Sequence, residues 1–250
     1  MAVKKLNYRR MSDEQLRELF ELERRANMRQ QEDILAKLLE TTIMIMGKKG
    51  RGKTLSGVAL SYMLRERFDR PVVVVGSSMG MTEAFGPHMR LDERAFRDEL
   101  ERMAVAASEE ENAEQVANAF EKYGVSLLWA IILFDEARKL ASSRRSSEKL
   151  VQLVGDYVMQ SRHYHNTIIF LAPAEDEIDK RIVRQVEWKG RCFHNKYTNT
   201  CHTRLRQGLE TLDLSINGKD ASQGHAPFYD MYDSWTMLGY RQSSLMVNNM

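Results

Sequence analysis

A glycine-rich segment at residues 47–54 constrains this chain more than any other feature. It reads Gly-Lys-Lys-Gly-Arg-Gly-Lys-Thr, which matches the pattern G-x-x-x-x-G-K-[ST]. A short apolar, β-branched run at 41–46 precedes it, and residues 55–64 after it have helical spacing. The pattern is informative only between a strand and a helix. Because both flanks agree, the segment predicts a phosphate-binding loop rather than a glycine-rich turn without a ligand.

The residue types in this loop suit a nucleoside triphosphate with Mg²⁺. Glycines let the backbone turn several N–H groups toward an anion, and the following helix adds the positive end of its dipole. Lys53 is expected to reach the β- and γ-phosphates, and the Thr54 hydroxyl to ligate Mg²⁺. The predicted nucleotide-binding residues are Gly47, Lys48, Lys49, Gly50, Arg51, Gly52, Lys53, Thr54 and Leu55.

Length and composition indicate one large domain with small appendages. The chain has 250 residues, and 43% of them are hydrophobic, which is enough for a sizeable core. Neither a signal peptide nor an apolar run of about 18 residues is found, so no stable membrane insertion is expected. The only cysteines, Cys192 and Cys201, do not make a disulfide framework. A reducing cytoplasmic setting is therefore expected.

The net charge of +2 hides an uneven distribution along the chain. Residues 92–114 hold nine acidic and three basic side chains, whereas residues 138–206 hold fourteen basic and seven acidic ones. An acidic middle and a basic later half indicate a directed surface for a polyanion. The alternative is that both segments are solvated faces without a partner.

Hydrophobic patterns along the chain predict alternating helices and strands. Helices are expected at 12–40, from the glycine-rich loop to about 68, at 93–122 and at 146–162; strands at 42–46, 71–76, 127–134 and 167–172; a loop at 77–91; and shorter, more polar strands at 191–197 and 201–216. Such alternation is typical of an α/β fold with a mainly parallel sheet flanked by helices. We expect an N-terminal helical extension (1–40), a core (41–217) and an aromatic-containing C-terminal tail (218–250).

The apolar strand that ends at residue 134 is followed by two carboxylates. Asp135 and Glu136 come directly after it, about eighty residues beyond the glycine-rich loop. The carboxyl end of a buried parallel strand opens onto the ligand site in such sheets. We therefore expect Asp135 to hold Mg²⁺ together with Thr54, and Glu136 to act as the base that polarises an attacking water.

Three later segments of the chain resemble those of a known family of ATPases. Residues 158–173, 178–184 and 190–193 resemble, in the same order, the FtsK–HerA motor ATPases, in which an arginine at a helix end precedes an apolar sensor strand. The pattern is also similar to zonula-occludens-toxin-like phage ATPases and to the packaging ATPases of membrane-containing viruses, over roughly residues 41–197. The resemblance implies a RecA-like P-loop core, ATP and Mg²⁺ as ligands, and a homo-oligomeric ring, a pentamer or hexamer.

The resemblance also implies an arginine finger, for which the sequence offers candidates, and a polar sensor residue, which is missing at its usual position. Ring motors complete their site with an arginine from the next subunit; Arg162 is the first candidate, followed by Arg184 and Arg181, with Arg144 and Arg145 behind them. The family's sensor strand ends in a polar residue, whereas residues 171–174 here read Leu-Ala-Pro-Ala. Asn166, Thr167 or Glu175 is then the substitute, or the sensing role lies elsewhere.

Two further groups of residues have open interpretations. Arg138, Lys139, Arg144 and Arg145 are either contacts to DNA phosphates or a solvated helix start. Cys192, His194, Cys201 and His202 match no common zinc spacing, although a metal site is a minor alternative.

These observations predict an ATP-hydrolysing translocase of double-stranded DNA, a viral genome-packaging motor. We expect it in the host cytoplasm or associated with the virion, with capsid or portal-vertex proteins as further partners. The alternatives are a phage assembly or secretion ATPase of the zonula-occludens-toxin-like type, and a nucleotide-dependent scaffold with little turnover.

Overall fold

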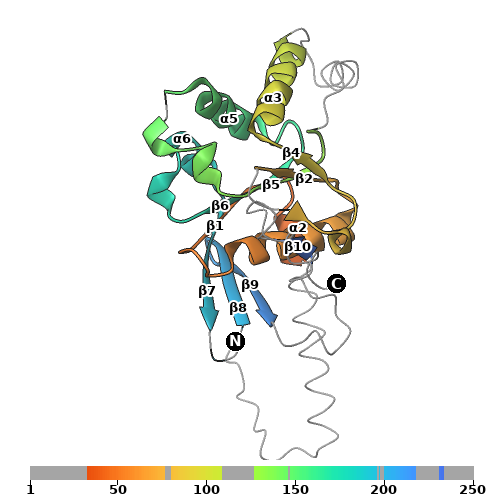
Figure 1. The fold of residues 1–250 in the computed structure, drawn as a ribbon, viewed down its shortest axis with the longest axis vertical. Helices are drawn as coiled ribbons and strands as arrows, with labels where there is room; N and C mark the ends of the chain where they lie inside the picture. The colour runs from red at the N-terminus through yellow and green to blue at the C-terminus, as the bar shows by residue number, and fades with distance from the viewer. Residues whose placement is uncertain are drawn as a thin grey trace, which may run out of the picture.

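The computed structural model describes residues 33–76, 80–108, 127–145, 147–195, 197, 200–217 and 231–233. An eight-stranded sheet in the order β4-β2-β5-β6-β1-β7-β8-β9 forms its centre (Figure 1). Its strands are β1 (Thr42–Met46), β2 (Val72–Val75), β4 (Met89–Leu91), β5 (Ile131–Phe134), β6 (Thr167–Ala172), β7 (Trp188–Asn195), β8 (Thr200–Gln207) and β9 (Glu210–Asn217). The α-helices are α2 (Lys53–Phe68), α3 (Glu93–Ser108), α5 (Lys149–Gln160) and α6 (Lys180–Gln185).

The sheet has a parallel part and an antiparallel part. All pairings from β4 to β7 are parallel, whereas β7, β8 and β9 form an antiparallel meander. Every residue of β1, β2, β5 and β6 is buried. Strands that are apolar on both faces need cover on both sides, as in parallel sheets generally. The expected mainly parallel sheet with flanking helices is therefore confirmed.

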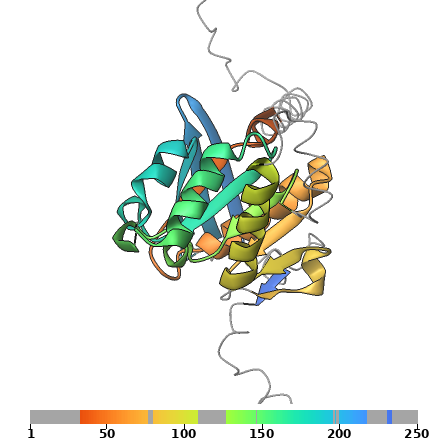
Figure 2. The ribbon, with the colours of Figure 1, turned by 90° about the horizontal axis from the view of Figure 1, so that it is seen from above.

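Two layers of helices supply that cover. Helices α3, α5 and α6 pack on one face, through side chains such as Phe96, Val154 and Ile182 (Figures 1 and 2). Helix α2 packs on the other face, where a Cβ atom at Gly57 would lie 2.9 Å from Leu171 Cδ2. Because glycine has no Cβ, α2 lies close against β5 and β6, which fixes the position of the loop before it.

The sequence patterns and the structure differ in two places. The expected strand at 127–134 begins only at Ile131, since Trp129 has a positive φ of 56° and the backbone N–H of Ala130 is bonded by the Asn166 side chain at 2.8 Å. The expected loop at 77–91 contains β3 (Gly80–Met81), a 3-10 turn and the edge strand β4. Both strands are too short to show a hydrophobic period.

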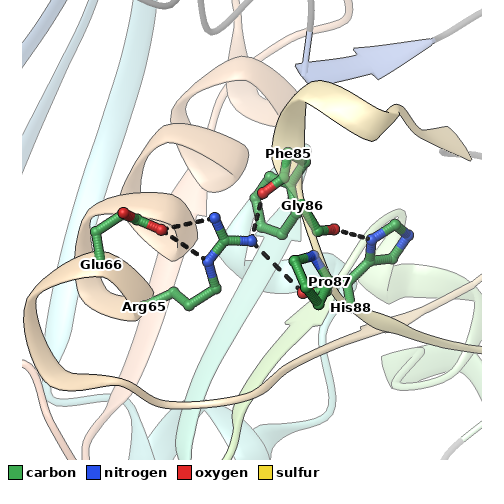
Figure 3. A network of polar contacts seen from close by, with 6 residues as sticks. All are labelled: Arg65, Glu66, Phe85, Gly86, Pro87 and His88. Atoms are coloured by element: carbon green, nitrogen blue, oxygen red, sulfur yellow. Dashed lines mark hydrogen bonds and ion pairs between the residues drawn. The ribbon is translucent and has the colours of Figure 1, made fainter.

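The segment before β4 is held to the end of α2 by one arginine (Figure 3). The Arg65 guanidinium donates to the backbone carbonyl of Phe85 and pairs with the Glu66 carboxylate, Nη2 to Oε1 2.7 Å. It also lies over the Phe85 ring, 4.8 Å from its centroid. Gly86 has a φ of 86°, and a Cβ there would approach Arg65 Nη1 to 3.0 Å. Glycine is therefore required at this turn.

Several expected elements fall partly outside the described residues. Of the predicted helix at 12–40, the structure describes residues 33–40, of which 33–37 are helical. Of the helix predicted at 93–122, α3 accounts for 93–108. From the tail, β10 (Tyr232–Asp233) pairs antiparallel with β3, and Met231 is fully buried.

Candidate nucleotide-binding site

The predicted functional residues meet at the carboxyl edge of the parallel strands. β1 leads into the loop 47–52, β5 ends at Phe134, directly before Asp135, and β6, which lies between β1 and β5, ends at Ala172. Parallel strands present their carboxyl ends at one edge, where ligands bind in open α/β sheets. The strand order therefore brings the two halves of the predicted site together.

The loop 47–52 has the backbone geometry of an anion cradle. Gly50 and Gly52 have φ values of 75° and 89°, in the left-handed region that disfavours other residues. Helix α2 begins directly after Gly52, with no acidic residue in its first turn. The first N–H groups of a helix have no partner within it, so they are available to a phosphate.

The loop is held from behind by the β7–β8 hairpin. A Cβ atom on Gly47 would lie 3.1 Å from the Cys192 carbonyl oxygen, and one on Gly52 only 2.3 Å from Cys201 Sγ. The Ser56 hydroxyl donates to the Gly52 carbonyl at 2.9 Å. These contacts explain why the loop needs glycine at both positions.

We expect Gly52→Ala to weaken ATP binding about tenfold or more. The substitution places a side chain at positive φ, which costs about 1–3 kcal/mol, and it displaces the loop from Cys201. A titration with a fluorescent ATP analogue measures the effect. Adding Cys201→Ala is expected to restore part of the affinity, while Cys201→Ala alone changes it little. Wild-type affinity in the Gly52→Ala protein would contradict this account.

Lys53 lies among the carboxylates of the site. Burial lowers the pKa of Lys53, while the nearby Cys192, Asp135, Glu136 and Glu177 act to raise the pKa again. The Nζ atom donates to the Lys48 carbonyl at 3.3 Å across the loop. The lysine is therefore half-buried and directed into the loop, where a β- or γ-phosphate would be its partner.

The two predicted metal ligands also face each other. Thr54 Oγ1 donates to Asp135 Oδ1 at 3.5 Å, and Asp135 is 8% exposed. A hydroxyl and a carboxylate beside a phosphate loop are the oxygen donors that Mg²⁺ prefers. These residues therefore fit Mg²⁺, which would neutralise charge on the phosphate oxygens.

Glu136 follows Asp135 with a strained backbone. Its φ is 52°, and its carboxylate pairs with Lys139 in the next turn. Its side chain is 44% exposed. The strain is compatible with a functional position, since non-glycine residues with positive φ cluster at such sites.

The possible sensor residues are placed differently from what we expected. Thr167 and Asn166 lie at the amino end of β6, on the edge opposite to the phosphate loop, so neither is a sensor in its own subunit. Asn166 has a structural role: its amide donates to the Leu127 carbonyl and the Tyr157 hydroxyl, at 2.6 and 2.8 Å. Glu175 lies at the correct edge, where it pairs with Lys189 at 2.8 Å.

Two of the candidate arginine fingers, Arg162 and Arg184, lie away from the phosphate loop of their own subunit. Arg162 precedes β6 at the opposite edge and pairs with Glu187, Nη2 to Oε2 2.7 Å. Arg184 is exposed in the last turn of α6, which leads toward the amino end of β7. β1, which leads into the phosphate loop, has five residues and therefore spans about 17 Å. Arg162 lies at the other end of this span, too far away to reach the loop of its own subunit. Neither arginine therefore contacts a nucleotide in the phosphate loop of its own subunit.

A basic pocket adjoins Glu136. It has a volume of about 440 Å³, and its walls come from the turns after β5 and after β6. Its lining residues are Arg138, Lys139, Ser142, Ser143, Arg144, Arg145, Asp176 and Glu177. The two turns are joined by the Ser143 hydroxyl, which donates to the Asp176 carbonyl at 2.8 Å.

Four contributors to the site were not predicted from the sequence: Glu177, Ser56, Cys192 and Thr203. Glu177 acts on Lys53, and Arg138 Nη1 lies 3.7 Å from Glu177 Oε2. Cys192 and Thr203 support the loop through Ser56, whose Oγ lies 2.7 Å from Thr203 Oγ1. The position of Glu177 just after a buried strand is the one signal that was available for it.

No metal cluster accompanies the cysteines in the described part of the chain. No group of three or more His, Cys, Asp or Glu residues suited to a metal ion is found there. Burial raises the pKa of the Cys192 thiol, and its hydrogen bonds with Ser56 and Thr203 act to lower it.

Among the described residues, no helix has both the length and the apolar character needed to cross a membrane.

Together these groups fit the chemistry of nucleoside triphosphate hydrolysis. The loop and Lys53 would bind the phosphates, Thr54 and Asp135 would hold Mg²⁺, and Glu136 would polarise water. No covalent intermediate is needed, because such sites act through positioning and electrostatic stabilisation.

Comparison with known proteins identifies relatives of the whole core. The family model described as zonular occludens toxin (Zot) matches residues 41–236. No curated protein matches the chain.

Solved structures with a similar fold include the following three proteins. The N-terminal domain of zonular occludens toxin from Neisseria meningitidis has 16% identity and a TM-score of 0.48, covering 77% of this chain and 98% of that one. B204, the DNA-packaging ATPase of Sulfolobus turreted icosahedral virus, has 9% identity, 70% and 96% coverage, and a TM-score of 0.44. The pCW3 conjugation coupling protein TcpA, with ATPγS, has 12% identity, 74% and 62% coverage, and a TM-score of 0.45.

Proposed function

The chain belongs to the zonular occludens toxin (Zot) family, and we propose that it is an ATP-driven motor that translocates double-stranded DNA, a viral genome-packaging motor. The observation that carries the proposal is the convergence of Lys53, Asp135 and Glu136 beside a basic pocket. The site of ATP hydrolysis and the basic pocket, which would contact a polyanion, are then adjacent.

The hydrolytic step follows from the residues of the site. Lys53 and the loop N–H groups stabilise the charge that develops on the phosphate oxygens. Glu136 orients a water and accepts its proton as the water attacks the γ-phosphorus. The bond from that phosphorus to the β–γ bridging oxygen breaks, and ADP leaves with the electron pair. Because Lys139 pairs with Glu136, that pairing would have to loosen when the water is positioned.

The basic pocket supplies a route from hydrolysis to DNA. Arg138 pairs with Glu177, and Lys139 pairs with Glu136, so both cations are tied to carboxylates of the nucleotide site. Arg144 and Arg145, on the next turn, are exposed. In the proposed mechanism, hydrolysis shifts these pairs and with them the arginines that contact DNA phosphates without regard to sequence.

The proposal includes a homo-oligomeric ring, a pentamer or hexamer. Arg162 and Arg184 lie far from the phosphate loop of their own subunit, which suits a role in trans. Capsid or portal-vertex proteins are the further partners we propose, with the host cytoplasm or the virion as the place of action.

The decisive experiment compares ATP hydrolysis with and without duplex DNA. We expect duplex DNA to stimulate phosphate release by the wild-type chain, and we expect salt to reduce the stimulation because it weakens phosphate contacts. Arg144→Gln with Arg145→Gln should lower the ratio of the hydrolysis rate with duplex DNA to the rate without it. The matched control is Arg97→Gln on α3, an exposed arginine outside the pocket. Equal rates with and without DNA would exclude a DNA motor.

The family match keeps a second function open, a phage assembly or secretion ATPase that moves protein or virions. It would hydrolyse ATP through the same residues without stimulation by DNA. The same assay therefore separates the two functions, and a nucleotide-dependent scaffold would show hardly any turnover under either condition.

A further inference from the structure

The antiparallel meander β7–β8–β9 has one face that no helix covers among the described residues. Its other face packs toward α2 through Cys192, Leu205 and Leu214. Figure 1 shows the three strands extending away from α5 and α6. A groove of about 650 Å³ runs along the uncovered face and reaches Met46, the last residue before the phosphate loop.

Six side chains along two strands of this groove define what we name the meander face. Alternate residues of a strand point to the same side, and the register makes cross-strand pairs of them. The pairs are Lys189 with Arg206, Arg191 with Arg204, and Phe193 with His202.

The meander face carries an excess of positive charge. Two cross-strand pairs join cations directly, although like charges in that position destabilise a sheet. Asp213 on β9 neutralises Arg204, Nη2 to Oδ2 3.0 Å, and Glu175 pairs with Lys189. Arg191 and Arg206 are exposed, and no ion pair with another described residue is found for either. The unbalanced charge fits an anionic partner.

Aromatic rings lie at the outer end of the same face. Phe193 is 55% exposed, and its ring stacks on that of His202, with centroids 4.9 Å apart and an interplanar angle of 20°. An exposed phenylalanine gains nothing from contact with water, but it offers a flat surface for a nucleobase. Rings beside a row of cations are typical of surfaces that hold unpaired nucleic acid.

We propose that the meander face binds single-stranded DNA, with phosphates on Arg191 and Arg206 and a base stacked on Phe193. Only an unpaired base exposes its flat surface to such a ring, because bases in a duplex stack on one another. The inference rests on the proposed function in placing DNA on this chain, and it adds a second contact on a different surface from the basic pocket.

Fluorescence anisotropy with labelled oligothymidine and with a blunt duplex tests the proposal on the full chain. Phe193→Ala should weaken oligothymidine binding about 5- to 150-fold and leave duplex binding unchanged, while Phe193→Trp should restore it. Arg191→Gln with Arg206→Gln should reduce the slope of log affinity against log salt by about 1.4. The control Arg97→Gln should change neither.

Each other outcome identifies a different error. Unchanged oligothymidine binding by Phe193→Ala would overturn the stacking contact. It would also be overturned if the arginine variants weakened binding of both DNA forms equally and Phe193→Ala weakened neither. If these variants change the oligomeric state instead of the affinity, the face is a subunit interface and the proposal is wrong. If the proposed function alone is wrong, the result is different: oligothymidine still binds through Phe193, but duplex DNA does not stimulate ATP hydrolysis.

Discussion

Replacing Lys53 with alanine is expected to lower ATP hydrolysis by about 10²–10³-fold or more and to weaken ATP binding. Lys53 is the cation at the start of α2 that is directed into the phosphate loop. Burial lowers the pKa of Lys53, and carboxylates including Asp135 and Glu136 act to keep the amine charged. Without the lysine, charge that develops on the phosphate oxygens would lose a positioned donor. Phosphate release and titration with a fluorescent ATP analogue measure the two effects.

The matched control for this prediction is Lys149→Ala. Lys149 is an exposed lysine at the start of α5 that pairs with Glu101 on α3. Its removal should leave both hydrolysis and binding near the wild-type values, since exposed ion pairs contribute little. Wild-type turnover by the Lys53→Ala protein would show that hydrolysis in the preparation comes from another source.

The parts of the fold that were predictable are those with a strong local signal. β1, β2 and β6 are continuous apolar runs, and the loop 47–54 is a motif whose glycines have the conformations it requires. β3 and β10 have two residues each, and they pair across some 150 positions of sequence. No local pattern reports such a pairing, so both strands were missed.

The same distinction separates the predicted from the unpredicted residues of the site. Lys53 and Asp135 belong to patterns that fix their place relative to a strand end. By contrast, Cys201 reaches Gly52 only because β8 folds back beside β7, a tertiary contact that the spacing of the cysteines does not encode. Asn166 and Thr167 were wrong candidates for the sensor because the polarity of β6 places its first residues at the opposite edge.

Glu136 is the residue on which the distinction between a motor and a scaffold depends. Glutamine is a matched substitution for Glu136, because it differs only in having an amide in place of the carboxylate. It has the same shape and places no new strain on the backbone at a φ of 52°. The amide removes the base and the ion pair with Lys139, while Lys53, Thr54 and the loop glycines remain. The substitution therefore separates proton transfer from nucleotide binding.

Glu136→Gln is expected to reduce ATP hydrolysis by about 10²–10⁴-fold while ATP affinity stays near the wild-type value. The control Glu101→Gln changes an exposed carboxylate on α3 and should affect neither quantity. Single-turnover hydrolysis and nucleotide titration measure the two parameters on the same preparation. A motor stalls with ATP bound, because binding energy is retained and only the chemical step is lost. A scaffold has a negligible rate in both proteins, so equal rates for wild type and Glu136→Gln would contradict the assignment of Glu136 as the base.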